Sequence, residues 1–373
     1  MTHIPVPLLD LKAQHATIRD EVMTLLHQVV EDQAFILGPV VGQLECAVAG
    51  LSKTRYAVGC ANGTDAILIA MRALNIGRDD EVVTTPFTFF ATAGTIHNVG
   101  ARPVFADIDP LTFNLDPAAA GAAVTSRTKA IIPVDLFGQM APMEQFRAAL
   151  GSLPIIEDAA QSIGARRGVD GFETMAGQEA TIGTYSFFPS KNLGGYGDGG
   201  MIVTQDEALF NTMMKLRTHG SIKTYYHEIV GYNSRLDALQ AAVLLAKLPH
   251  LEAWSGARRA NAASYDQAFA DVAEIVTPYV DPANQSIYNQ YTIRAQKRDE
   301  LQAYLKQRDI GCSVYYPLPL HLQPCFAYLG YKEGQFPESE RASQEVLSLP
   351  VFPELTTAQR DTVVDAVRSF YGR

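Results

Sequence analysis

The sequence has little cysteine and no excess of positive charge. Its 373 residues include only four cysteines, Cys46, Cys60, Cys312 and Cys325, and none of them forms a C-x-x-C pair. We therefore expect free thiols in a reducing compartment, not a disulfide framework. Lysine and arginine number 30 against 40 aspartate and glutamate, a formal net charge of -10. This balance argues against a nucleic-acid partner, although local backbone amides can still hold an anion.

Long hydrophobic runs are also missing. No stretch reaches the roughly 18 uninterrupted apolar residues of a membrane span, and the N-terminus has no basic patch followed by an apolar run. Metal-site and esterase signatures such as H-E-x-x-H and G-x-S-x-G do not occur either. Hydrophobic residues make up 47% of the chain, enough for more than one core. We expect a cytoplasmic globular protein with no membrane span and no metal site.

From residue 38 to about 205, short apolar runs alternate with helical patterns. The expected strands are YAVG, EVVTTP, ARPVFADI, KAIIPVD and PIIED, and the clearest expected helix is TDAILIAMRAL. This alternation predicts an α/β fold with a mostly parallel sheet covered by helices. Ligands of such sheets collect beyond the carboxyl ends of the strands.

After residue 205 the pattern changes to longer helices, and we place a domain boundary near residue 255. Residues 1–254, including the N-terminal segment, form the predicted large domain. Residues 255–373 form a smaller α+β domain. Its expected elements are the strands YTIRA and GCSVYYP and the helices KRDELQAYLKQRD and TTAQRDTVVDAVRSF.

The segment SFFPSKNLGGYGDGG, residues 186–200, combines one lysine with many glycines. Gly195, Gly197 and Gly200 satisfy G-x-G-x-x-G, but a dinucleotide-binding turn needs a helix after it, and here the expected strand MIVT follows. A phosphate-binding G-x-x-x-x-G-K-[ST] loop also fails, because these glycines follow Lys191 and do not precede it. Neither nucleotide-binding motif explains the segment.

Lys191 could be a solvated charge on a flexible loop. Three features favour a buried lysine: the flanking runs TYSFF and MIVT are apolar, two phenylalanines and a proline come just before it, and the glycines permit close approach of a bulky group. An amine in apolar surroundings loses its proton more easily and becomes nucleophilic. Schiff-base chemistry follows, either with a carbonyl substrate directly or with pyridoxal phosphate.

Pyridoxal phosphate requires a phosphate cup, which the start of the expected helix TDAILIAMRAL supplies. Asn62, Gly63 and Thr64 lie between a strand and that helix, where backbone N–H groups and the helix dipole favour an anion. Ser186 adds a hydroxyl group. Thr64 could also be a simple N-cap.

The cofactor ring requires an acid and a flat partner. Asp158 ends the expected strand PIIED, where it could pair with a protonated pyridine nitrogen, and an ordinary turn aspartate is the alternative. Phe89 in PFTFFAT could stack on the ring, or it could be a core residue.

Together these segments resemble the DegT/DnrJ/EryC1/StrS family, pyridoxal-phosphate aminotransferases of the aspartate-aminotransferase fold (fold type I) that aminate keto sugar nucleotides. The resemblance covers essentially the whole chain. It rests on PLLDLKAQ, FILGPVVGQLE, CANGTDAIL, TPFTFFAT, DIDPLTFNLDP, EDAAQSIGA, SFFPSKNLGGYGDGG, GYNSRLDALQAA, YNQYTIR and VYYPLPLHLQP. Some relatives carry histidine in place of this lysine and dehydrate sugars, so Lys191 favours transamination.

The resemblance implies a role for each matching residue. Lys191 would bind the cofactor aldehyde and Asp158 its pyridinium nitrogen, while Gln161 would contact the ring oxygen. Asn62, Gly63, Thr64 and Ser186 would surround the phosphate, and Phe89 would stack on the ring. Asn233 in GYNSR would reach the phosphate of the neighbouring subunit, so that a homodimer would share its active sites.

The substrates implied by the resemblance are L-glutamate, released as 2-oxoglutarate, and a UDP-linked 2-acetamido-3-keto-hexuronic acid used for surface polysaccharides. A dTDP-3-keto-6-deoxyhexose or another keto sugar nucleotide is the alternative. Arg235 is a candidate carboxylate clamp. Tyr315, Tyr316 and His321 are candidates for sugar contact from the second domain; many relatives have histidine where this chain has Tyr315.

Two other classes of function remain open at this point. A pyridoxal-phosphate-binding regulator without turnover would need a DNA-binding domain, and no helix-turn-helix segment precedes the first strand. A lysine-dependent aldolase or dehydratase without a cofactor would have no use for the phosphate cup.

Overall fold

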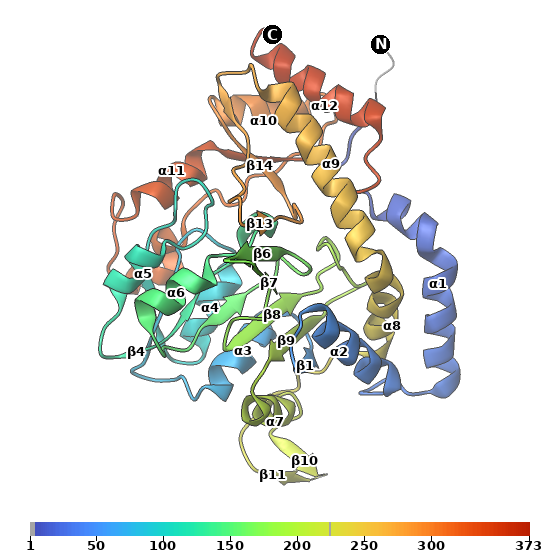
Figure 1. Cartoon of the computed structure of the whole chain (residues 1–373), viewed down its shortest axis with the longest axis vertical. Helices are drawn as coiled ribbons and strands as arrows, with labels where there is room; N and C mark the ends of the chain where they lie inside the picture. Colours follow the sequence, from blue (N-terminus) through green and yellow to red (C-terminus); the bar gives the residue numbers. More distant parts are fainter. Residues whose placement is uncertain (1–3, 224) are drawn as a thin grey trace.

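A computed structural model of the chain describes residues 4–223 and 225–373 (Figure 1). Its centre is a seven-stranded sheet, in which two parallel bridges, Ile131 to Ile155 and Val134 to Asp158, join a four-stranded and a three-stranded part. In spatial order the strands are β1 (Tyr56–Cys60), β9 (Gly200–Thr204), β8 (Ile182–Ser186), β5 (Ile156–Asp158), β4 (Thr128–Ile132), β2 (Glu81–Thr84) and β3 (Arg102–Phe105). Only β9 runs antiparallel to its neighbours, so the predicted mostly parallel sheet is confirmed.

Helices cover both faces of this sheet, which explains why its strands are apolar on both sides. Successive residues alternate between faces: Ile202 packs with the helices of one face, and Met201 and Val203 pack with those of the other. The first face carries α3 (Gly63–Ala73), α4 (Phe90–Asn98) and α7 (Glu207–Leu216). The second face carries α1 (Leu11–Asp32), α2 (Pro39–Leu51), α5 (Pro117–Ala123), α6 (Met143–Leu150) and α8 (Ala238–Lys247).

A second core is formed mainly by the C-terminal part of the chain. It surrounds an antiparallel sheet in the order β12-β14-β15, and both the strand YTIRA and the two helices predicted there are confirmed. The elements are α9 (Leu251–Phe269), β12 (Ile275–Val276), β14 (Tyr291–Ala295), α10 (Arg298–Lys306), α11 (Pro337–Glu345), β15 (Val346–Leu349) and α12 (Thr357–Phe370).

The strand predicted over residues 311–317 is wrong. In that segment only Ser313 pairs, through an isolated bridge to Ser348. The segment then turns toward the first domain, where the Tyr316 hydroxyl meets Gln161. Pro317 and Pro319 also lack the N–H groups that would continue a ladder.

The long helix α9 connects the two cores. Its N-terminal residue Leu251 packs in the first core, whereas Ala262 and Phe269 pack in the second. The predicted boundary near residue 255 falls inside this helix and stays a prediction. Val6, which the prediction assigned to the large domain, is buried in the second core and pairs with Ile310.

Smaller elements complete the chain. A three-stranded sheet joins the hairpin β6–β7 to a short strand from the later part of the chain, and the hairpin β10–β11 projects beyond α7 (Figure 1). The bounds are β6 (Arg166–Val169), β7 (Phe172–Met175), β10 (Ser221–Lys223), β11 (Tyr226–His227) and β13 (Asn284–Gln285), with 3₁₀ turns η1 (Leu136–Gly138), η2 (Leu248–His250), η3 (Leu320–Leu322) and η4 (Pro324–Leu329). In residues 4–223 and 225–373, no helix has the length and apolar character needed to cross a membrane.

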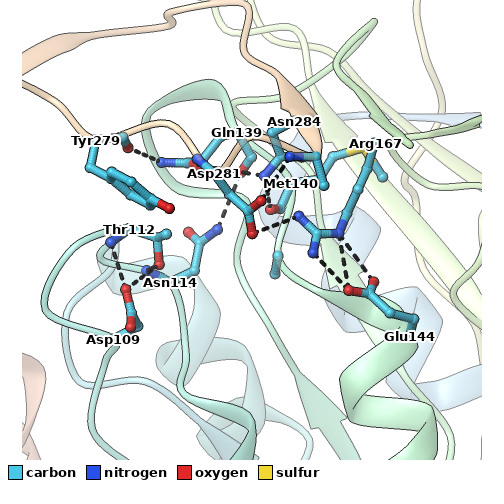
Figure 2. A network of polar contacts seen from close by, with 12 residues as sticks. Asp109, Thr112, Asn114, Gln139, Met140, Glu144, Arg167, Tyr279, Asp281 and Asn284 are labelled. Carbon is cyan, nitrogen blue, oxygen red and sulfur yellow. Dashed lines mark hydrogen bonds and ion pairs between the residues drawn. The ribbon is translucent and has the colours of Figure 1, made fainter. Parts of the chain in front are cut away.

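A polar network fixes the segment around β13 against the first domain (Figure 2). The buried Arg167 guanidinium donates to Glu144 at 2.7 Å and to Asp281 at 3.1 Å. Gln139 donates through Nε2 to the carbonyl oxygen of Tyr279 at 2.8 Å. The two carboxylates compensate the cost of burying the Arg167 charge. The segment that begins at Tyr279 is therefore held by directional hydrogen bonds.

Candidate active site

The candidate site lies at one edge of the central sheet, where two neighbouring strands end. β5 and β8 are parallel, and Asp158 pairs in register with Thr184. Asp158 is the last residue of β5 and Ser186 the last of β8, so both lie at the carboxyl edge. The chain continues from Ser186 directly into the glycine-rich segment with Lys191. This is the edge at which the sequence predicted a ligand.

The Lys191 segment is tightly folded, which accounts for its glycines. The backbone N–H of Lys191 donates to the carbonyl oxygen of Phe188 at 2.8 Å. A Cβ atom on Gly194 would lie 2.3 Å from the Pro189 carbonyl oxygen, and one on Gly197 would lie 2.9 Å from the Gln240 amide nitrogen. A side chain does not fit at Gly194, where the contact is with backbone, whereas one at Gly197 would have to displace the end of the Gln240 side chain.

The Lys191 side chain is half-buried, and its amine is surrounded by protein groups and lies within electrostatic reach of Asp158. Burial lowers the pKa of Lys191 from 10.5 to about 8, and the negative charge of Asp158 partly opposes this shift. An amine with this pKa is partly neutral near physiological pH. It can therefore act as a nucleophile or as a base.

Asp158 is buried and keeps hydrogen-bond donors on both carboxylate oxygens. The Thr92 hydroxyl donates to Oδ2 at 2.8 Å, and the Ala160 backbone N–H donates to Oδ1 at 3.3 Å. Burial raises the pKa of Asp158, while these two donors and the charge of Lys191 lower it. A carboxylate oriented in this way can pair with a cationic ring nitrogen.

The start of α3 meets the end of β8. Asn62 is the N-cap of α3, because its Oδ1 accepts the backbone N–H of Asp65 at 2.8 Å, and α3 begins at Gly63. Thr64, the capping residue considered from the sequence, is instead exposed inside the first turn. A Cβ on Gly63 would lie 2.6 Å from the Cβ of Ser186. Only glycine allows the helix start to approach the Ser186 hydroxyl this closely, in a geometry suited to an anion.

Gln161 connects the sheet edge to Tyr316, which comes from the later part of the chain. Its Oε1 accepts the backbone N–H of Phe137 at 2.7 Å, and its Nε2 donates to the Tyr316 hydroxyl at 3.2 Å. The Tyr316 ring lies 6.4 Å from that of Phe89. Phe89 is 58% exposed, so the alternative that it is a core residue does not hold and its ring remains available for stacking.

Asn233 and Arg235 form a separate pair. The Arg235 guanidinium donates to Asn233 Oδ1 at 2.5 Å. Arg235 also lines a cavity of about 750 Å³ beside the β10–β11 hairpin, together with His219 and Lys223. In the described part of this single chain, no hydrogen bond or ion pair links the Asn233–Arg235 pair to Lys191.

Tyr315 and His321 differ in their surroundings. Tyr315 lies beside Tyr316, with the ring centroids 5.9 Å apart. His321 is 2% exposed, its Nε2 lies 3.0 Å from Glu340, and its ring packs edge-on against Phe336. Burial lowers the pKa of His321, although Glu340 opposes the shift. In this structure His321 is packed between Glu340 and Phe336, its buried Nδ1 has no hydrogen-bond partner among the described residues, and its contact with a substrate stays a prediction.

The sequence reasoning missed Thr92 and Asn192. Thr92 binds Asp158 across 66 residues of chain, and the only hint was its place in the segment TPFTFFAT. Asn192, directly after Lys191, is hydrogen-bonded to Asn289 across 97 residues. Contacts between such distant residues leave no local pattern that could have revealed them.

The residues at this edge fit pyridoxal phosphate. Three groups of that cofactor need a partner: its phosphate, its ring nitrogen and its aldehyde. The helix start at Gly63 with Ser186 suits the phosphate, the oriented carboxylate of Asp158 suits the ring nitrogen, and the amine of Lys191 suits the aldehyde. Among the described residues no three histidine, cysteine, aspartate or glutamate side chains form a group that could hold a metal ion.

The pH dependence of Lys191 can be tested on the cofactor-free protein. The rate at which an amine-reactive reagent labels Lys191, followed by peptide mass spectrometry, should rise with pH and reach half its maximum near pH 8. The labelling of exposed lysines should have its midpoint near their usual pKa of about 10.4. Because folding lowers this pKa, the contribution of Lys191 favours the folded state above the unfolded value of 10.5 and is lost as the pH falls through 8. A midpoint near 10 would contradict the enclosed amine.

Comparison with known proteins gives one consistent family. The DegT/DnrJ/EryC1/StrS aminotransferase family profile matches residues 16–368. A protein of Geobacillus stearothermophilus called a pleiotropic regulatory protein is 53% identical over 372 residues, covering 98% of each chain.

Two relatives with enzyme names are each 43% identical. One is the UDP-N-acetyl-3-dehydro-alpha-D-glucosamine 3-aminotransferase of Acidithiobacillus ferrooxidans, matched over 97% of each chain. The other is the UDP-2-acetamido-2-deoxy-3-oxo-D-glucuronate aminotransferase of Pseudomonas aeruginosa, matched over 95% of this chain and 97% of the relative.

Among solved structures, DesV of S. venezuelae in complex with a ketimine intermediate superimposes with a TM-score of 0.96 at 39% identity, over 99% of each chain. The fold class and the family resemblance predicted from the sequence motifs are confirmed. The chain belongs to the DegT/DnrJ/EryC1/StrS aminotransferase family.

Proposed function

We propose that the protein transfers an amino group from L-glutamate to the 3-keto group of a UDP-linked 2-acetamido-2-deoxy-hexuronic acid, for the sugars of a surface polysaccharide. The broader statement, an aminotransferase that depends on pyridoxal phosphate and acts on keto sugar nucleotides, follows from family membership. The observation that carries the proposal is the enclosed amine of Lys191 beside the oriented carboxylate of Asp158 at the sheet edge.

Pyridoxal phosphate, when bound, supplies an electron sink that stabilises negative charge on the carbon next to the transferred nitrogen. The chain must hold it and move protons. Lys191 would bind its aldehyde and later carry a proton between the donor carbon and the cofactor carbon. Asp158, held by Thr92, would keep a proton on the pyridine nitrogen.

The remaining cofactor contacts follow from the geometry of the edge. The first backbone N–H groups of α3 and the Ser186 hydroxyl would hold the phosphate. The exposed ring of Phe89 would stack on the cofactor. Gln161 uses one N–H for Tyr316 and has a second for the ring oxygen.

The substrate assignment rests on the relatives and on one arginine. The names of the two 43% identical enzymes share the UDP group and carbon 3 but differ at carbon 6 of the sugar. A hexuronate and glutamate both carry a carboxylate, which the Arg235 guanidinium could bind with two parallel N–H donors. One arginine would then serve both half-reactions, and Tyr315 and Tyr316 would line the sugar side.

A homodimer with shared active sites is part of this proposal. Asn233 is exposed, and Arg235 faces a cavity beside the projecting hairpin, so both are free to complete the site of a neighbouring subunit. Sparse, unpaired cysteines favour a cytoplasmic location, where nucleotide sugars are made.

The function is tested by the near-visible spectrum of the purified protein. L-glutamate should bleach the absorption of bound pyridoxal phosphate, and the UDP-linked 3-keto-hexuronic acid should restore it, because the two half-reactions alternate. 4-keto and dTDP-linked sugars serve as the comparison panel. Restoration by a dTDP sugar alone would move the assignment to the alternative substrate, and a protein that binds the cofactor without any bleaching would be a regulator. Lys191→Ala should abolish turnover.

Shared active sites are tested by mixing two inactive variants, Asn233→Ala and Lys191→Ala, under conditions that exchange subunits. A hybrid dimer has one site in which both residues are intact, so about a quarter of wild-type activity should return at equal mixing if subunits pair at random. The matched control mixes Lys191→Ala with Asp158→Ala, two residues of the same edge in one chain, which should restore no activity. Equal recovery in both mixtures, or none in the first, argues against a site completed by Asn233.

A further inference from the structure

The residue directly after Lys191 is held by the segment that follows β13. Asn192 is only 4% exposed, and both ends of its amide are used. Its Nδ2 donates to the carbonyl oxygen of Ile287 at 3.0 Å, and its Oδ1 accepts from Asn289 Nδ2 at 2.7 Å. Ile287 and Asn289 follow β13 in a stretch that touches both cores, since Ile287 packs in the first core and Tyr288 packs against the second.

These contacts end a longer segment, residues 279–290, which we call the interdomain strap. Its first half is fixed by Gln139 and Arg167, as Figure 2 shows. In its second half, the backbone N–H of Ile287 donates to the Gly138 carbonyl oxygen at 2.9 Å, and the Ser286 hydroxyl donates to the same oxygen at 3.1 Å. The strap therefore has a defined position along its whole length.

Two further features fix the strap next to Asn289. The buried Arg258 on α9 donates to the carbonyl oxygen of Tyr288 at 3.1 Å. On the opposite side Gly138 adopts φ +106°, and a Cβ there would lie 2.7 Å from the backbone nitrogen of Asn289. Glycine at 138 thus lets the strap approach closely enough to reach the Lys191 segment.

The side-chain amide of Asn289 is oriented so that its donor, Nδ2, makes a hydrogen bond and its acceptor, Oδ1, does not. Asn289 is 7% exposed, and within the described residues its own Oδ1 has no hydrogen-bond partner. Burying an unpaired acceptor costs free energy, which the short bond from Nδ2 to Asn192 must offset. A packing role alone would be met by an apolar side chain of the same size.

We propose that Asn289 and Asn192 are a pair of positioning residues that fix the amine of Lys191 relative to Asp158 and couple it to the placement of the second domain. The role in catalysis rests on the proposed function. Because Asn192 is covalently joined to Lys191, the contacts that hold its amide at both ends also restrain the Lys191 backbone. Displacements of the order of 1 Å at a reacting group lower rates strongly.

The test compares Asn289→Ala with wild type in two measurements. In the cofactor-free protein, the labelling midpoint of Lys191 should rise from about 8 toward 10.5, by roughly one pH unit, because a loosened segment admits water to the amine. In the loaded enzyme, kcat with glutamate should fall about tenfold with KM changed less than twofold, as expected for a misplaced reacting group.

Ser286→Ala is the matched control, since it removes two other buried strap contacts, the hydroxyl's bond to Gly138 and its acceptance of the Tyr288 N–H, without touching the Lys191 segment. It should lower the unfolding temperature by about as much as Asn289→Ala does, and it should leave the labelling midpoint of Lys191 unchanged. Asn289→Leu, which keeps the volume without a donor, replaces Asn289→Ala if that variant does not fold. Asn289→Gln, which keeps an amide donor, should restore part of the lost rate.

Several results would overturn the proposal. One is an unchanged labelling midpoint of Lys191 in a folded Asn289 variant, and another is an equal shift of that midpoint in Ser286→Ala. A third is failure of both Asn289→Ala and Asn289→Leu to fold, which would make the contact purely structural. The labelling comparison needs no cofactor. It therefore decides this inference even if the wild-type protein fails to bind pyridoxal phosphate and the proposed function is lost.

Discussion

The arrangement of the whole edge depends on one lysine amine enclosed by protein with one nearby carboxylate. An enclosed ammonium group is expensive, and burial accordingly lowers the pKa of Lys191 to about 8, against the opposing charge of Asp158. The parallel pairing of β5 and β8 brings the two groups to the same edge, although 33 residues separate them in the sequence. What the fold positions is therefore a reactive amine and its counter-charge.

Close packing of backbone around that amine explains the composition of the neighbouring segments. At Gly63, Gly194 and Gly138, a Cβ would collide with Ser186, Pro189 and the strap, respectively. Gly63 allows α3 to approach β8, and Gly194 allows the Lys191 segment to fold back on itself. Gly138 allows the strap to approach the first part of the chain. Of the three glycines in the G-x-G-x-x-G match, Gly200 is also required by packing, because a Cβ there would lie 2.4 Å from the Asn62 carbonyl oxygen. The strand β9 begins at Gly200, where a nucleotide fold would have a helix.

Local patterns predicted much of this, and distant contacts were out of their reach. Hydrophobic alternation was sufficient to predict the helix-covered sheet, and the apolar flanks of Lys191 pointed to a lysine with a lowered pKa. The antiparallel direction of β9 could not be read, because a strand buried on both faces has the same composition in either direction. Thr92 with Asp158 and Asn289 with Asn192 depend on tertiary geometry. The tyrosines at 315 and 316 suggested a strand, but their neighbouring prolines and the contact with Gln161 led the segment elsewhere.

A second lysine makes the central claim sharply testable. Lys247 is buried, burial lowers its pKa to about 8 as well, and the negative charge of Glu354 partly opposes this shift. Its Nζ, however, already donates to the Gly194 carbonyl oxygen at 2.7 Å. The most direct measurement is borohydride reduction of the protein with pyridoxal phosphate, followed by peptide mass spectrometry. The account predicts a phosphopyridoxyl group on Lys191 and none on Lys247. Modification of Lys247 or of surface lysines, with Lys191 unmodified, would contradict it.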